Sequence, residues 1–153
     1  MAAGIRVTTH RYSFQVVREV EPAYPTGAGV TTPRDAVAIA QHVIGGQISE
    51  VVLALFLDAR HRITGYAEIV RGTLNAARLT PRDILVPALA VNAAALVVAH
   101  CHPSGELSPS RADRQVTAVL RQACELIGVP LLDHLIVTED AHFSFRESEG
   151  WGE

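Results

Sequence analysis

An apolar segment that ends in two histidines is the feature that most constrains how this chain can fold. Residues 93–99 read Ala-Ala-Ala-Leu-Val-Val-Ala, and His100, Cys101 and His102 follow directly. An apolar run of this kind predicts a strand that is buried on both faces of a sheet. Side chains two residues apart on a strand share a face. We therefore expect His100 and His102 to point together and Cys101 to point away.

A serine and an aspartate follow the histidines at a spacing that suits a metal site. The pattern reads His100-x-His102, then seven residues, then Ser110-x-x-Asp113. Two imidazoles and one carboxylate leave a tetrahedral position open, which is the arrangement of catalytic zinc. Ser-x-x-Asp is also a capping box, so a purely structural role for Ser110 and Asp113 stays open. We expect His100, His102 and Asp113 to bind one Zn²⁺ per chain.

Four separate segments carry a wider family pattern. They are Glu50–Leu57 with Asp58, Arg71–Asn75, His100–Gly105 and Leu131–His134. Together with the H-x-H-x7-S-x-x-D motif, they resemble the RadC family, whose terminal domain carries the JAMM motif of JAB/MPN metalloproteases. The resemblance spans roughly residues 30–147. It departs from the family at Cys101, where RadC-like proteins usually carry Asn, and we expect no helix-hairpin-helix region of the kind found in longer members.

The resemblance implies a fold, an activity and roles for two more residues. The fold is α/β, a mixed sheet between helices in a deaminase-like α/β/α layer arrangement. The activity is that of a zinc metallohydrolase that cleaves an amide or isopeptide bond in a peptide-like substrate. By this resemblance, we expect Glu50 to be the general base and Ser110 to donate a hydrogen bond to the oxyanion. A solvated charge is the structural alternative for Glu50, and Glu68 is the second candidate for the base.

Composition favours one compact domain over residues 1–153. Apolar residues make up 48% of the chain and aromatic residues 5%, and the formal net charge is −3. That charge argues against a broad nucleic-acid surface. No signal-peptide core or membrane-spanning apolar run is evident, so we expect a cytoplasmic protein. A DNA repair or recombination accessory and a metal-stabilised interaction module without turnover remain alternatives. The ligand pattern of zinc nucleobase deaminases is missing.

Strands and helices are expected to alternate along the chain. Helix starts are predicted at Thr32–Asp35 and Thr80–Asp83, and Pro87 should kink or delay the second helix. A third helix has an apolar face over residues 116–127 and ends at Gly128. We expect fraying after Glu147. The predicted strands, besides the one before His100, are Tyr12–Val17, Val51–Leu57, Ile63–Val70, Leu131–Val137 and His142–Phe145, with a loop over Glu21–Val30.

The remaining chemically active side chains receive mostly structural interpretations. Cys101 and Cys124 are expected to be reduced, and Cys101 to be a small buried residue. Ser104 should shape a turn. Asp133 and His134 resemble a RadC signature, for which a contact to a metal ligand stays open beside the favoured role of a hydrogen-bonded structural histidine.

Overall fold

The computed structural model describes residues 33–72 and 79–151, so the predicted strand Tyr12–Val17 and loop Glu21–Val30 lie outside the described residues. The sheet has the strand order β2-β1-β3-β4-β5, in which only the β3–β4 pair is parallel. The elements are α1 (Pro33–Ile44), β1 (Val51–Leu57), β2 (Ile63–Arg71), α2 (Pro81–Ala90), β3 (Ala95–Cys101), α3 (Arg111–Ile127), β4 (Leu131–Val137), β5 (His142–Ser144) and α4 (Phe145–Glu149).

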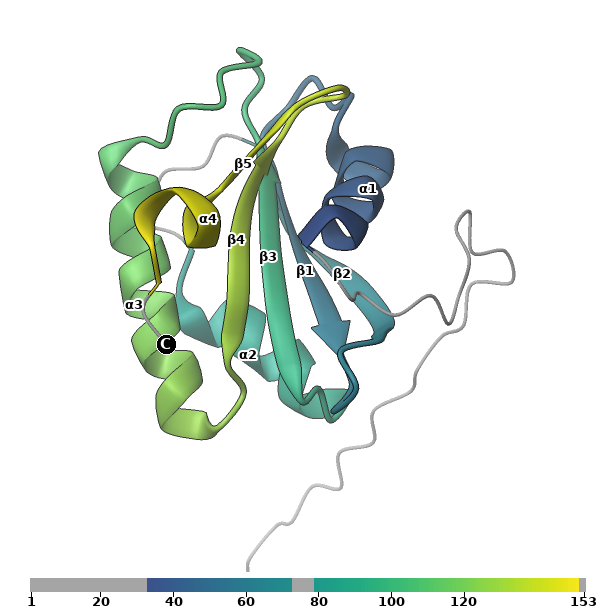
Figure 1. The fold of residues 1–153 in the computed structure, drawn as a ribbon, viewed down its shortest axis with the longest axis vertical. Coiled ribbons are helices and arrows are strands. Elements are labelled where there is room, and N and C mark those ends of the chain that lie inside the picture. The colour runs from purple at the N-terminus through teal and green to yellow at the C-terminus, as the bar shows by residue number, and fades with distance from the viewer. Residues whose placement is uncertain (1–32, 73–78, 152–153) are drawn as a thin grey trace, which may run out of the picture.

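Helices cover both faces of this sheet. In Figure 1, α1 lies against one face, which we call the α1 face, and α2 and α3 lie against the other, which we call the α3 face. The parallel pair β3 and β4 is joined through α3, as parallel neighbours require a crossover connection. The expected α/β sandwich with a mixed sheet is therefore confirmed.

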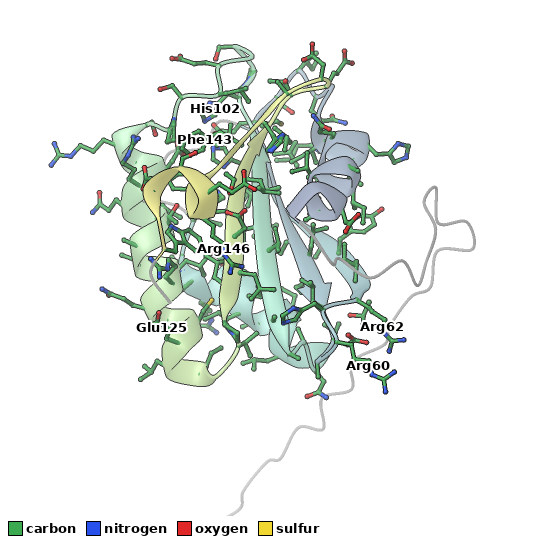
Figure 2. The ribbon with its side chains drawn as sticks, in the orientation of Figure 1. Arg60, Arg62, His102, Glu125, Phe143 and Arg146 are labelled. Atoms are coloured by element: carbon green, nitrogen blue, oxygen red, sulfur yellow. The ribbon has the colours of Figure 1, made fainter. Side chains whose placement is uncertain are left out.

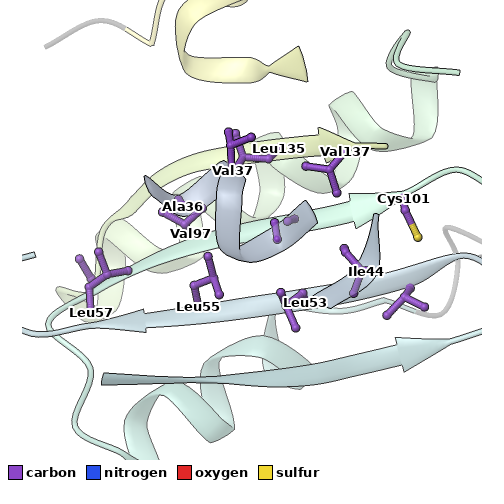
Figure 3. Close-up of a cluster of buried hydrophobic side chains, with 14 residues drawn as sticks. Ala36, Val37, Ile44, Leu53, Leu55, Leu57, Val97, Cys101, Leu135 and Val137 are labelled. Carbon is purple, nitrogen blue, oxygen red and sulfur yellow. The ribbon is translucent and has the colours of Figure 1, made fainter. Parts of the chain in front are cut away.

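Alternation along β1 and β3 divides the core into two clusters. On β1, Leu53 and Leu55 pack on the α1 face, whereas Phe56 packs on the α3 face. On β3, Val97 and Cys101 belong to the α1-face cluster, which Figure 3 shows between the sheet and α1. His100, one residue earlier, therefore emerges on the α3 face.

Glycines mark the ends of two helices, and the one at Gly128 was predicted from the sequence. The α3 helix ends at Ile127, and Gly128 follows in the left-handed conformation with φ of 72°. Its N–H bonds the carbonyl of Glu125, which satisfies one of the free carbonyls of the last turn. Gly45 follows α1, and a Cβ at that position would lie 2.9 Å from the carbonyl oxygen of Thr138. Gly45 thus lets the end of α1 approach the end of β4.

Two expectations about regular structure need correction. Of the two effects expected of Pro87, a delayed helix is excluded, because α2 begins at Pro81 and contains Pro87. The helix α4 extends to Glu149, beyond Glu147, after which fraying was expected, and Phe145 belongs to that helix and not to β5. Ser144 caps α4 because its side chain accepts a hydrogen bond from the N–H of Glu147.

Candidate metal centre

The two histidines converge at the end of β3. His100 is the second-last residue of β3 and pairs with Val52 of β1. Its side chain is only 2% exposed. His102 follows the strand and lies near the loop that leads to α3 (Figure 2). The two Nε2 atoms are 2.9 Å apart. The prediction that the pair points together is confirmed.

Asp113 approaches both histidines from the first turn of α3. Its Oδ1 lies 3.4 Å from Nε2 of His100, and its Oδ2 lies 3.5 Å from Nε2 of His102. The same carboxylate accepts the N–H of Ser110 at 2.7 Å, and the Ser110 hydroxyl accepts the N–H of Asp113 at 3.1 Å. The capping box therefore holds Asp113 in place beside the histidines, and the two interpretations of the Ser-x-x-Asp pattern are compatible.

These donor atoms fit a divalent metal. Neighbouring ligands of a tetrahedral zinc with bonds of 2.0–2.1 Å are separated by roughly 3.3 Å. The separations between Asp113 and the two imidazoles, 3.4 and 3.5 Å, are slightly above that value, and the 2.9 Å between the two imidazole Nε2 atoms is slightly below it. Nδ1 of His102 lies 2.7 Å from the carbonyl oxygen of Glu106, which can only accept, so Nδ1 carries the proton. A neutral His102 then presents an Nε2 lone pair to the centre.

Glu50 joins the same end of the sheet. The β1–β3 register pairs Val51 with Cys101, so continuing it by one residue brings Glu50 beside His102. A carboxylate oxygen of Glu50 and one ring nitrogen from each of His100 and His102 all lie within 4.8 Å of one another. These three residues form a group that could bind a metal ion, with Glu50 half-buried.

Burial keeps the inner imidazoles uncharged. Removal from water lowers the pKa of His100 to about 4, although the nearby Asp113 carboxylate acts in the opposite direction. Burial likewise lowers the pKa of His134 well below its ordinary value, and the two neighbouring imidazoles add to the effect. Neutral imidazole is the form that binds metals, and the lowered pKa of His100 favours this form at neutral pH.

His134 supplies a contact that sequence reasoning left as the less favoured alternative. Its Nε2 lies 2.8 Å from Nδ1 of His100, and its Nδ1 lies 2.6 Å from the hydroxyl of Thr117. Thr117 was not singled out from the sequence. Its place four residues after Asp113 on a helix was the available signal, because residues at that spacing share a helix face.

The contacts of the other candidate residues are explained by structural roles. Cys101 is buried on the α1 face, and burial raises the pKa of its thiol. The Ser104 hydroxyl accepts the N–H of Glu106 in the turn after β3. Glu68 forms an ion pair with Arg71 at 2.6 Å on the exposed side of β2. Cys101 and Cys124 are both free thiols, as expected.

An apolar hollow adjoins the centre. A small cavity is lined in part by His100, Asp113 and His134. Next to it is a larger cavity of about 370 Å³ between the start of α2 and α3. Leu79, Ala112 and Val116 line both cavities, so the larger cavity is adjacent to the small one beside the centre.

Within residues 33–72 and 79–151, none of the helices is both long and apolar enough to cross a membrane.

Comparison with known proteins gives a consistent result. A family model described as the RadC-like JAB domain matches residues 30–151. The chain is 42% identical over 147 residues to a UPF0758 protein of Stenotrophomonas maltophilia strain K279a, covering 96% of this chain and 60% of that protein. It is 50% identical over 109 residues to a UPF0758 protein of Burkholderia thailandensis, covering 71% of this chain and 41% of that protein. The chain thus spans about 60% or less of the length of these relatives. On these grounds the chain belongs to the RadC family, as a RadC-like JAB domain.

Proposed function

We propose that this domain is a zinc-dependent hydrolase that cleaves an amide or isopeptide bond. The observation that supports the proposal most is the convergence of three donor groups at the end of β3. The Nε2 atoms of His100 and His102 and the carboxylate of Asp113 lie 2.9–3.5 Å from one another. In this proposal these three residues hold the metal, which leaves Glu50 for proton transfer.

Zinc is the metal that suits this donor set, because two imidazoles and one carboxylate are its usual ligands in catalytic sites. When bound, zinc supplies a water whose pKa is lowered to about 7. His102 is held for this task by the carbonyl of Glu106 and Asp113 by the capping box. Both are therefore oriented by main-chain groups before any ligand binds.

Glu50 acts as the proton carrier. Its carboxylate takes a proton from the attacking water and delivers it to the leaving nitrogen. With the hydrogen that the amide nitrogen already carries, this proton makes the leaving group a neutral amine when the carbon–nitrogen bond breaks. The position within 4.8 Å of the histidine nitrogens is close enough to the centre for this role. Ser110 accepts the N–H of Asp113, so its own hydroxyl proton can be donated to the carbonyl oxygen of the substrate.

The experiment that tests the proposal replaces Glu50 with Gln. Glu50→Gln keeps the size of the side chain but cannot accept the proton, so the cleavage rate should fall by on the order of 10²–10⁴. Glu68→Gln is the matched control, because Glu68 is a carboxylate of the same sheet that pairs with Arg71 on the exposed side. Zinc content should stay equal in the parent and both variants.

The substrates are a mixed library of peptides and isopeptide-linked peptides, assayed with added zinc and with a chelator control. Equal cleavage by the parent and by zinc-loaded Glu50→Gln would refute the proposed mechanism. A zinc-loaded parent that cleaves no member of the library would favour a metal-stabilised interaction module.

A further inference from the structure

A buried line of polar contacts runs behind the metal centre. It leads from Nδ1 of His100 to Nε2 of His134 at 2.8 Å, and from Nδ1 of His134 to Oγ1 of Thr117 at 2.6 Å. It ends where the Thr117 hydroxyl reaches the main-chain oxygen of Asp113 at 2.6 Å. All three side chains are at most 4% exposed. The line therefore connects two of the proposed ligands through two residues that have no other assigned role.

The direction of each hydrogen bond in this line follows from its last acceptor, the main-chain oxygen of Asp113. The carbonyl oxygen of Asp113 can only accept, so Thr117 donates its single hydroxyl proton to it. The Thr117 oxygen can then only accept from Nδ1 of His134, which must carry a proton. A neutral His134 has no second N–H, so its Nε2 accepts the Nδ1–H of His100.

His100 is left with its lone pair on Nε2. This atom is the one that lies 2.9 Å from Nε2 of His102 and 3.4 Å from the carboxylate of Asp113. If the hydrogen bonds of His134 ran in the opposite direction, the proton of His100 would be on Nε2, and an N–H would point to the place where a metal would bind. The His134 ring is 4% exposed and contacts His100, Thr117 and Phe145, which carry no negative charge, so burial favours the neutral form.

We propose that Thr117 and His134 are positioning residues that set the tautomer of His100, so that its Nε2 lone pair faces the metal. The proposal rests on the metal centre of the proposed function and extends it beyond the ligands. Groups that orient a ligating histidine in this way typically contribute 10–100-fold to metal affinity. A merely structural His134 would contribute to folding stability and nothing to affinity.

Thr117→Val tests this directly, because valine keeps the shape of threonine and removes the hydroxyl. His134 then loses the acceptor that holds its Nδ1 proton, and the proton can move to Nε2. Zinc affinity of the full chain, measured by competition with a chromophoric chelator, should fall by about 10–100-fold. Thr117→Ser keeps the hydroxyl and should return the affinity toward that of the parent.

Ser144→Ala is the matched control. Ser144 is also a buried hydroxyl, and it donates to Asp133, the residue next to His134. Its loss should lower stability in a similar way yet leave zinc affinity unchanged. A folded Thr117→Val with the zinc affinity of the parent would overturn the proposal.

A second measurement needs no variant and no metal. Nitrogen NMR of the imidazole rings in the metal-free parent reads which ring nitrogen is protonated. We expect the proton of His134 on Nδ1, with its Nε2 accepting from Nδ1 of His100, and a His134 proton on Nε2 would overturn the proposal even if Thr117→Val failed to fold. Loss of the hydrolase activity by itself leaves both readouts intact, so the two proposals can fail separately.

Discussion

The α1 face of the sheet is apolar along the whole of β3, whereas the α3 face becomes polar where β3 and β4 reach the candidate metal centre. Cys101 is the only member of the α1-face cluster with an ionisable side chain. On the α3 face, His100, Thr117 and His134 are buried beside an apolar cluster. His100 therefore joins the polar groups of the α3 face and Cys101 packs in the apolar α1-face cluster, because successive side chains of a strand alternate between faces.

The polar face is tolerated because its groups bond to one another. Within residues 33–72 and 79–151, no buried side-chain nitrogen or oxygen lacks a hydrogen-bond partner. A buried polar group without a partner costs about 1–3 kcal/mol, so such a network is stable only when it is complete. The α1 face has no such requirement and contributes to stability through packing. The two faces should therefore respond differently to mutation.

The largest expected effect is on metal content. His102→Ala removes a proposed ligand from the polar end of the sheet, and the purified protein should lose most of its zinc. Metal analysis of protein purified without chelator measures the change, with about one zinc per chain expected in the parent. Full and tight occupancy in the variant would place the metal elsewhere.

The opposite pattern is expected on the α1 face. Leu55 is fully buried there, and Leu55→Ala should lower the free energy of unfolding by about 2–5 kcal/mol. Zinc content should remain that of the parent, because Leu55 points away from the centre. Urea denaturation of chelator-treated protein gives the stability. A folded variant without zinc would mean that the two faces are not independent.

The two faces also differ in their expected response to pH. Burial lowers the pKa of His100 from 6.5 to about 4 and that of His134 well below 6.5. The unfolded chain therefore takes up protons first as the pH falls. The stability of the metal-free protein should be fully present above pH 6.5 and should decline as the pH falls toward 4.

Each such histidine contributes a slope of at most about 1.4 kcal/mol per pH unit. Urea denaturation across this range measures the slope. The Leu55→Ala variant should show the slope of the parent, because the α1-face cluster contributes no group that titrates there. A flat profile for the parent would contradict the neutral state of the buried pair.

The sequence predicted the central strands well because their apolar runs are long and their ends are marked. Val51–Leu57 and Leu131–Val137 have the predicted bounds, and the third helix ends before Gly128. The short α4 helix was missed because Phe145 continues the pattern of a strand. Ser144-x-x-Glu147 was the helix-start signal, and the structure uses it as a cap.

The contacts that residues outside the proposed ligand set make with the candidate metal centre could not be predicted in the same way. His100, His102 and Asp113 lie within one short stretch of chain, so their spacing alone suggested a common site. The contact of His134 with His100 depends on the parallel register of β3 and β4, in which His134 pairs with Val98. The pairing also includes an irregularity between Leu96 and Val97, and no local pattern indicates such a shift.

The smallest expected effect separates capping from metal binding. Asp113 and Asp83 occupy the same position in two helices, and each accepts the main-chain N–H of the residue that precedes its helix, at 2.7 and 2.8 Å. Without metal, Asp113→Ala and Asp83→Ala should each cost about 1 kcal/mol of unfolding free energy.

With zinc present, the two variants should diverge. The parent and Asp83→Ala gain stability from binding, whereas Asp113→Ala should gain little, because it lacks a proposed ligand. Thermal unfolding with and without added zinc measures both gains. Equal stabilisation of the two variants by zinc would show that Asp113 only caps α3, and the third ligand would then have to be Glu50, the other carboxylate beside His100 and His102.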